Sequence, residues 1–160
     1  MNTEVQKRGV SPRDVFLHIL AMIGLYVSAI SFGNLIFELI NIYLPDPLNY
    51  YPVATYDSIR WSVAVLIIIF PVYVYLTKYL YDDLVRNPEK RELKIRKWLI
   101  YLTLTLAASV IIGDLITLVY YLLKGDIALR FILKVITVLF IAASIFIYYR
   151  WELKMQREIM

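Results

Sequence analysis

The 160-residue sequence contains no cysteine and a single histidine, His18. Without cysteine, the chain has no disulfide, no iron–sulfur cluster and no thiol nucleophile. One histidine excludes a haem held by two histidines of the same chain and a histidine-rich metal site, and no Ser-His-Asp set is recognisable in the sequence. The sequence also has no glycine-rich phosphate loop. We therefore expect no enzyme activity, no cofactor and no bound metal.

Charged residues are also scarce, because Asp, Glu, Lys and Arg make up 19% of the chain while 61% is hydrophobic. A soluble domain has about 25% charged and about 45–50% apolar residues. The apolar excess is concentrated in four runs, at residues 15–44, 59–80, 98–123 and 129–149. Each run is long enough to cross a bilayer as a helix, which takes about 20 apolar residues. The pattern predicts an all-α fold: a four-span transmembrane helical bundle with short loops, in one domain covering residues 1–160.

The basic residues predict how this bundle is oriented in the membrane. All but four of the 17 lysines and arginines lie on the side shared by the two termini and the connection at 81–97. The positive-inside rule therefore places both termini in the cytoplasm. We expect the protein in the cell inner (cytoplasmic) membrane. The same placement explains the net charge of +4. We therefore expect the lipid bilayer as a partner and no nucleic acid.

Local signals predict where the helices begin, bend and end. Ser11, followed by a proline and then by Asp14, is typical of a helix start with a capping box. Pro71 lies inside the second span and predicts a kink. The third helix should begin near Pro88, before the membrane, so that it is extended at its cytoplasmic end. Gly125 predicts a tight turn between the third and fourth spans.

The outer half of the first span carries a polar stripe. Its members are spaced so that they share one helical face: Ser31, Asn34, Glu38 and Asn41. Polar groups are costly against lipid tails, so we expect this face to meet other helices or a cavity. The same span contains small residues that allow close helix packing: Gly24, Ser28 and Gly33.

Each span contributes one ionisable residue to the outer half of the membrane. These are two acids and two bases: Glu38, Arg60, Asp114 and Lys134. A charge at the centre of a membrane helix costs roughly 2.5–3.5 kcal/mol on insertion scales. We therefore expect the four residues to form a buried, self-neutralising charge network. Polar residues on nearby faces are candidates to line it: Ser31, Asn34, Thr117 and Thr137.

Two interpretations of this network remain open. The charges either lock four helices together or belong to an ion or proton pathway. Side chains on helices lean toward their own N-terminus, and this direction leaves Asp114 as the residue most short of a partner. Arg60 could instead extend to the headgroups at the outer end of its helix. His18 is expected to bond to the charged 81–97 connection, with proton handling as the alternative role.

Several separated motifs of the chain are similar to those of one protein family. They are Ser11-Pro-Arg-Asp-Val-Phe, Ser31-Phe-Gly33, Pro45-Asp-Pro47, Ser58-Ile-Arg-Trp61, Asn87-Pro-Glu-Lys-Arg91, Ile95-Arg-Lys-Trp-Leu99, Gly113-Asp114 and Leu129-Arg-Phe131. The chain resembles a family of small prokaryotic four-helix integral membrane proteins catalogued only as a domain of unknown function. The resemblance covers nearly the whole chain and implies a single four-span domain. It implies no catalytic residues.

The sequence therefore indicates a class of protein and leaves two functions to compare. The first is an accessory, assembly or structural membrane subunit within a larger membrane complex. The second is a small ion channel or proton-coupled transporter built around Asp114. A bundle of four helices has little interior for a pore of its own, so this second function requires a homo-oligomer.

Overall fold

A computed structural model describes residues 11–47, 52–125 and 127–159. These residues form four long α-helices: α1 (Pro12–Tyr43), α2 (Pro52–Arg86), α3 (Lys94–Lys124) and α4 (Leu129–Ile159). A short 3-10 helix, η1 (Pro88–Glu92), connects α2 to α3. All four long helices are apolar and long enough to cross a membrane, and there is no strand in the described ranges. The predicted all-α, four-span fold is confirmed.

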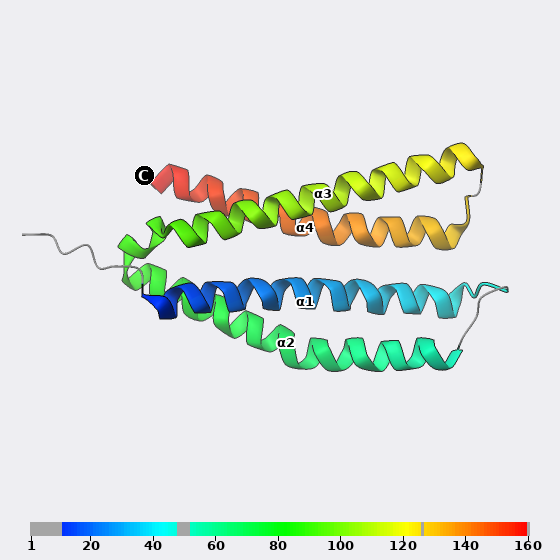
Figure 1. The fold of residues 1–160 in the computed structure, drawn as a ribbon, viewed down its shortest axis with the longest axis horizontal. Helices are drawn as coiled ribbons and strands as arrows, with labels where there is room; N and C mark the ends of the chain where they lie inside the picture. Colours follow the sequence, from blue (N-terminus) through cyan, green and yellow to red (C-terminus); the bar gives the residue numbers. More distant parts are fainter. Residues whose placement is uncertain (1–10, 48–51, 126, 160) are drawn as a thin grey trace, which may run out of the picture.

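The helices form two antiparallel hairpins, α1 with α2 and α3 with α4 (Figure 1). We call the end where α1 begins and α4 finishes the termini end, and the opposite end the loop end. Helix α1 contacts all three other α-helices. In its most apolar stretch 28% of the residues are buried, against 11% in each of the others. Helix α1 is therefore the central helix of the bundle.

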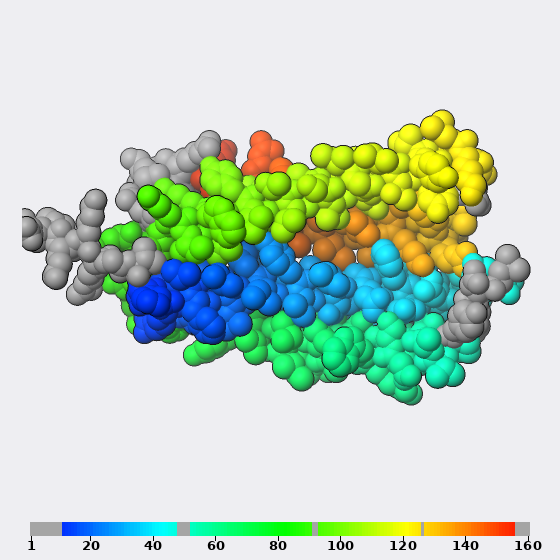
Figure 2. Space-filling model, viewed as in Figure 1, coloured from blue at the N-terminus to red at the C-terminus, as the bar shows by residue number. Residues whose placement is uncertain are grey.

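The two hairpins are not packed equally along their length. In Figure 2, α3 covers α1 near the termini end, whereas toward the loop end α4 is visible between α3 and α1. A Tyr26–Thr103 hydroxyl contact joins α1 to α3. The Thr103 hydroxyl also lies 2.9 Å from the Leu99 carbonyl of its own helix, to which it can donate. The Tyr26–Thr103 contact anchors α3 to the central helix in the half nearer the termini end.

Small residues set the close packing of α1, as predicted. A Cβ added at Gly24 would lie 3.2 Å from the Tyr73 Cβ of α2, closer than ordinary van der Waals contact. A Cβ at Gly33 would lie 3.5 Å from the Ile141 side chain of α4, which is ordinary contact. Of these two glycines, Gly24 is therefore the one that lies closer to a neighbouring helix.

The helix ends agree with the sequence in part. Gly125 has φ +77 and terminates α3 in the left-handed conformation, as predicted. The capping box at Ser11 is wrong, because within the described chain the Ser11 side chain makes no cap bond. Near Pro88 the chain forms η1, and α3 begins only at Lys94. Helix α2 contains Pro71 and bends midway along its length, in agreement with the predicted kink (Figure 1).

The helices are longer than the hydrocarbon layer that they would cross. At 1.5 Å per residue, α1 with its 32 residues is about 48 Å long, against about 30 Å of hydrocarbon. Large apolar side chains remain exposed along all four helices, among them Ile30, Ile67, Ile116 and Phe140. These side chains give the bundle an apolar outer surface, as a membrane-spanning bundle requires.

Candidate functional site

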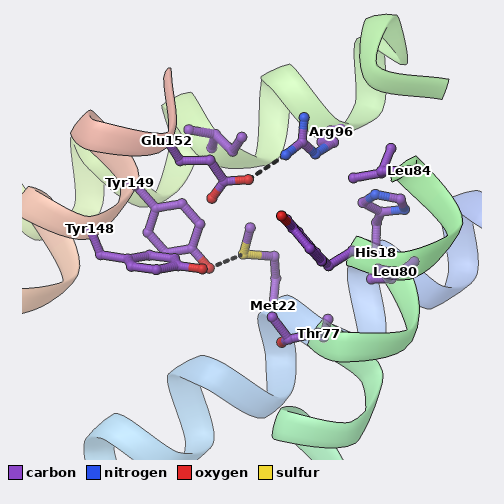
Figure 3. Close-up of a pocket in the computed structure, with 12 residues that line it drawn as sticks. His18, Met22, Thr77, Leu80, Leu84, Arg96, Tyr148, Tyr149 and Glu152 are labelled. Atoms are coloured by element: carbon purple, nitrogen blue, oxygen red, sulfur yellow. Dashed lines mark hydrogen bonds and ion pairs between the residues drawn. The ribbon is translucent and has the colours of Figure 1, made fainter. Parts of the chain in front are cut away.

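All four helices line a cavity of about 90 Å³ at the termini end (Figure 3). Tyr148, Tyr149 and Glu152 of α4 lie on one side of it, facing His18 of α1 and Leu84 of α2. The complete lining is His18, Ala21, Met22, Thr77, Leu80, Tyr81, Leu84, Arg96, Ile100, Tyr148, Tyr149 and Glu152. In this cavity, charged, aromatic and apolar groups of all four helices converge.

An ion pair forms one wall of the cavity. Arg96, two residues into α3, donates from its guanidinium to the Glu152 carboxylate near the end of α4. The Arg96 side chain is 11% exposed and that of Glu152 is 25% exposed. Because both groups are largely shielded from water, this pair is stronger than an ion pair on an open surface. It holds the two helices of the second hairpin together at the cavity.

His18 lies opposite that pair and is 8% exposed. Its Nδ1 donates to the Asp14 carbonyl one helical turn earlier, at 2.7 Å. Among the described residues, His18 does not form the expected bond to the 81–97 connection. In a neutral ring with Nδ1 protonated, Nε2 carries the lone pair and accepts hydrogen bonds. This Nε2 is buried and has no hydrogen-bond partner among the described residues.

The floor of the cavity is apolar and closely packed. Tyr149 is 6% exposed, and its hydroxyl lies 3.7 Å from the Met22 sulfur of α1. Ile100 of α3 is 1% exposed and Leu80 of α2 is 8% exposed. The cavity therefore combines an apolar floor with a polar rim, a division typical of ligand sites.

A second group of charges lies beside the cavity and joins three elements. Lys90 of η1 donates to Asp83 of α2 at 2.8 Å and to Asp14 of α1 at 3.4 Å. Asp14 is 5% exposed, so it is a buried partner in this cluster and does not act as the predicted cap acid. The hydrogen bond to Asp83 raises the pKa of Lys90 above its ordinary value of 10.5. We call Asp14, Asp83 and Lys90 the Lys90 cluster.

The structure does not assemble the four predicted network residues in one place. Arg60 pairs with Asp57 of its own helix at 2.9 Å, and both side chains are largely exposed. Lys134 lies over the Phe37 ring, 5.5 Å from its centroid, on the side of α1 that carries Glu38. Glu38 accepts a 3.2 Å bond from Asn41. The structure thus brings Lys134 near Glu38 and leaves Arg60 outside the predicted network.

Asp114 is the predicted network residue with the most unusual surroundings. It lies on the half-buried side of α3, and its Oδ2 is buried without a hydrogen-bond partner among the described residues. Nothing lies within 4 Å of where a Cβ on the neighbouring Gly113 would be. The described parts of the chain thus supply no hydrogen bond to Oδ2. The role of Asp114 stays a prediction.

The four predicted lining residues do not share one surface. Asn34 donates to Ser58 and to Ser62 of α2, each at 2.8 Å, and so holds the first hairpin together. Thr117 is exposed, and its hydroxyl donates to the Gly113 carbonyl. Thr137 and Ser31 are half-buried, and the Thr137 hydroxyl donates to the Leu133 carbonyl. These contacts satisfy the hydroxyls of Thr117 and Thr137 within their own helices.

Sequence reasoning missed the cavity because its charged residues lie far apart in the chain. Arg96 and Glu152 are separated by 56 positions. The sequence did indicate the depth of both residues, because each lies close to a tryptophan, Trp98 or Trp151, and tryptophans mark the membrane interface.

Across the described residues no group of three or more Asp, Glu, His or Cys could hold a metal ion.

Comparison with known proteins places the chain in a family but adds no activity. No curated protein and no solved structure matches the chain. Residues 14–149 match the family described as "Domain of unknown function (DUF5671)". The matched segment runs from the buried Asp14 to the cavity residue Tyr149, and it covers α2 and α3 whole and most of α1 and α4. The chain therefore belongs to the DUF5671 family.

Proposed function

We propose that this protein is an accessory or assembly subunit of a larger membrane complex. Asp114 carries the proposal, because a carboxylate in a membrane helix requires a hydrogen-bond donor or a cation and Oδ2 has none within the described chain. Asp114 as a whole is only half-buried, so its carboxylate can turn toward a transmembrane helix of a second subunit, which could supply that donor. The open space beside Gly113 would let such a helix approach α3 closely, as small residues do in membrane interfaces.

Salt bridges support the same proposal by keeping the bundle itself closed. The Lys90 cluster joins α1 to the α2–α3 connection at the termini end. Arg130 of α4 binds Asp46, which follows α1, at 3.1 Å at the loop end. A bundle fastened at both ends is suited to act as a rigid unit on which other subunits assemble.

Gentle extraction followed by native mass measurement tests the proposal. We expect the wild-type chain to leave the membrane with one defined partner at a fixed ratio. Asp114→Leu should lose that partner, whereas Thr117→Val should keep it, because the exposed Thr117 hydroxyl is already bonded to its own helix. A homogeneous self-oligomer or a monomer of the wild type would contradict the proposal.

The same unpartnered oxygen favours one alternative, a small ion channel or proton-coupled transporter working as a homo-oligomer around Asp114. In this case wild-type protein reconstituted alone in vesicles should carry a flux of protons or of a common ion. Asp114→Asn should abolish the flux and Thr117→Val should leave it unchanged. Absence of any wild-type flux would exclude this alternative.

We infer in addition that both ends of the chain face the cytoplasm in a cell inner membrane. The distribution of lysine and arginine supports this orientation. Because the chain has no cysteine, single-cysteine variants can report it directly. A membrane-impermeant thiol reagent applied to intact cells should label Tyr56→Cys at the loop end and leave Ser11→Cys unlabelled. The opposite labelling pattern would reverse the orientation.

A further inference from the structure

We propose that the cavity at the termini end binds the headgroup of an aminophospholipid, a primary ammonium joined by two carbons to a phosphate. The inference is independent of any role of Asp114, which lies in the other half of α3. It depends on the depth of the cavity, on the groups that line it and on its size.

The depth of the cavity matches the headgroup layer. His18 lies six residues after Pro12, about 9 Å along α1. Helix α1 exceeds the hydrocarbon thickness by about 18 Å, which leaves about 9 Å at each end when it is centred. The cavity therefore opens where the hydrocarbon ends and lipid headgroups begin.

The polar groups of the cavity select a ligand that donates hydrogen bonds. Nε2 of His18 is buried, unpartnered among the described residues and, in the neutral ring, an acceptor. The Glu152 carboxylate is an acceptor as well, and two oxygens give it room for more than its bond from Arg96. Both groups favour an ammonium with N–H bonds over a quaternary ammonium, which has none.

The aromatic side chains favour a cation at the same place. Tyr81, Tyr148 and Tyr149 all line the cavity, and aromatic faces attract ammonium groups. A volume of about 90 Å³ leaves room for a small cationic group in the cavity.

Arg96 accounts for the phosphate part of the headgroup. Its guanidinium belongs to the polar rim and places positive charge next to Glu152. A ligand with one positive and one negative group matches this arrangement, with its ammonium toward Glu152 and its phosphate toward Arg96. The Arg96–Glu152 ion pair remains in place, and both of its charged groups orient the ligand electrostatically.

Lipid titration of the purified full chain, followed by native mass spectrometry, tests the proposal. The probes are phosphatidylethanolamine, phosphatidylcholine and phosphatidylglycerol with identical acyl chains, together with soluble phosphoethanolamine. Phosphatidylethanolamine should bind about tenfold or more tightly than the other two lipids, the ratio expected for a lost charge-assisted hydrogen bond. Equal binding of the three lipids would overturn the proposal. Equally tight binding of soluble phosphoethanolamine would overturn the lipid source.

Variants connect the lipid preference to the cavity. His18→Phe keeps a ring but loses the acceptor, and Glu152→Gln removes the negative charge, so each should reduce the preference for phosphatidylethanolamine about tenfold. Glu38→Gln, a matched change at the loop end, should retain it. Tyr148→Leu provides a test less exposed to misfolding, because that ring is 46% exposed, and it should weaken the preference several-fold. Retention of the full preference in all three cavity variants would overturn the assignment.

Discussion

Replacement of Lys90 by methionine tests whether the Lys90 cluster holds the bundle together. The change keeps the length and apolar stem of the side chain and removes the ammonium that binds Asp83 at 2.8 Å and Asp14 at 3.4 Å. Asp14 would then lose its short contact, with Arg13 remaining at 4.0 Å. We expect Lys90→Met to lower the free energy of unfolding.

The size of the loss follows from burial. Removal of one member of a fully buried ion pair costs about 3–5 kcal/mol, because the other charge stays buried. The Asp14 side chain is 7% exposed and that of Lys90 is 26% exposed, so water screens part of the interaction. Arg13 also compensates part of the charge. We therefore expect a loss of about 2–3 kcal/mol, below the fully buried limit.

Arg60→Met is the matched control. Its ion pair with Asp57 has nearly the same length, 2.9 Å, but the two side chains are 78% and 65% exposed. Such pairs contribute about 0–1 kcal/mol. Both variants can be measured by unfolding in mixed micelles of increasing denaturing-detergent content. Equal losses for Lys90→Met and Arg60→Met would refute the reasoning, because the Lys90 cluster is largely buried and joins three elements, whereas the Arg60–Asp57 pair is exposed and lies within one helix.

The pH dependence of this loss has a defined direction. Hydrogen bonding to Asp83 raises the pKa of Lys90 in the folded protein above its ordinary value of 10.5. The contribution of Lys90 to stability is therefore complete below 10.5 and disappears as the pH rises through the folded-state pKa. The stability difference between wild type and Lys90→Met should be constant from neutral pH to about 9 and shrink only above 10.5. A difference that decreased between pH 6 and 9 would contradict this assignment.

Two further predictions concern helix packing and use the same unfolding assay. Gly24→Leu should destabilise the protein by about 1–3 kcal/mol, because even a Cβ at this position would lie 3.2 Å from the Cβ of Tyr73. Gly113→Ala should be neutral or stabilising by up to about 1 kcal/mol, because the surroundings of Gly113 are open. A larger loss of stability for Gly113→Ala than for Gly24→Leu would contradict the packing. Asn34→Leu should lower the free energy of unfolding by about 0.6–1.7 kcal/mol, because it removes both hydrogen bonds to the α2 serines. One of these serines, Ser62, is 1% exposed. An unchanged unfolding curve would show that these bonds contribute nothing.

The fold could be predicted from the sequence because hydrophobic length and helix signals act locally. Four apolar runs required four helices, and the short connections between them required antiparallel neighbours. Gly125 and Pro71 act on their own segment of backbone, so the turn and the kink were predictable as well. The Ser11 cap failed because Asp14, which was expected to complete it, is recruited into a buried contact with Lys90, 76 positions away.

The candidate site was harder to predict because a sequence indicates how deep a residue lies along its helix better than it indicates which way the side chain points. Glu38, Arg60, Asp114 and Lys134 do fall in the loop half of their helices, but pairing also depends on how each helix is rotated. Arg60 projects from the exposed side of α2 and finds Asp57 on its own helix. Lys134 faces α1 and reaches the Phe37 ring. Rotation is set by packing such as the Gly24–Tyr73 approach, and one sequence does not report it.

Asp114 and the cavity suggest different kinds of function, because the chain supplies different groups at the two places. The cavity has its acceptors, its positive charge and its aromatic rings already in place, so a ligand completes it without changing the bundle. At Asp114, in contrast, the described residues cover Oδ2 but supply no hydrogen-bond donor to it. A carboxylate retained in such a place needs a group from outside the chain, whether a second subunit or a proton. Asp114→Leu tests this account. The variant should raise the unfolding free energy of the isolated chain, because it removes a polar group that costs roughly 2.5–3.5 kcal/mol in a membrane helix. The same variant should disrupt the native assembly. A variant that was both less stable alone and unchanged in its assembly would show that Oδ2 is satisfied within the chain.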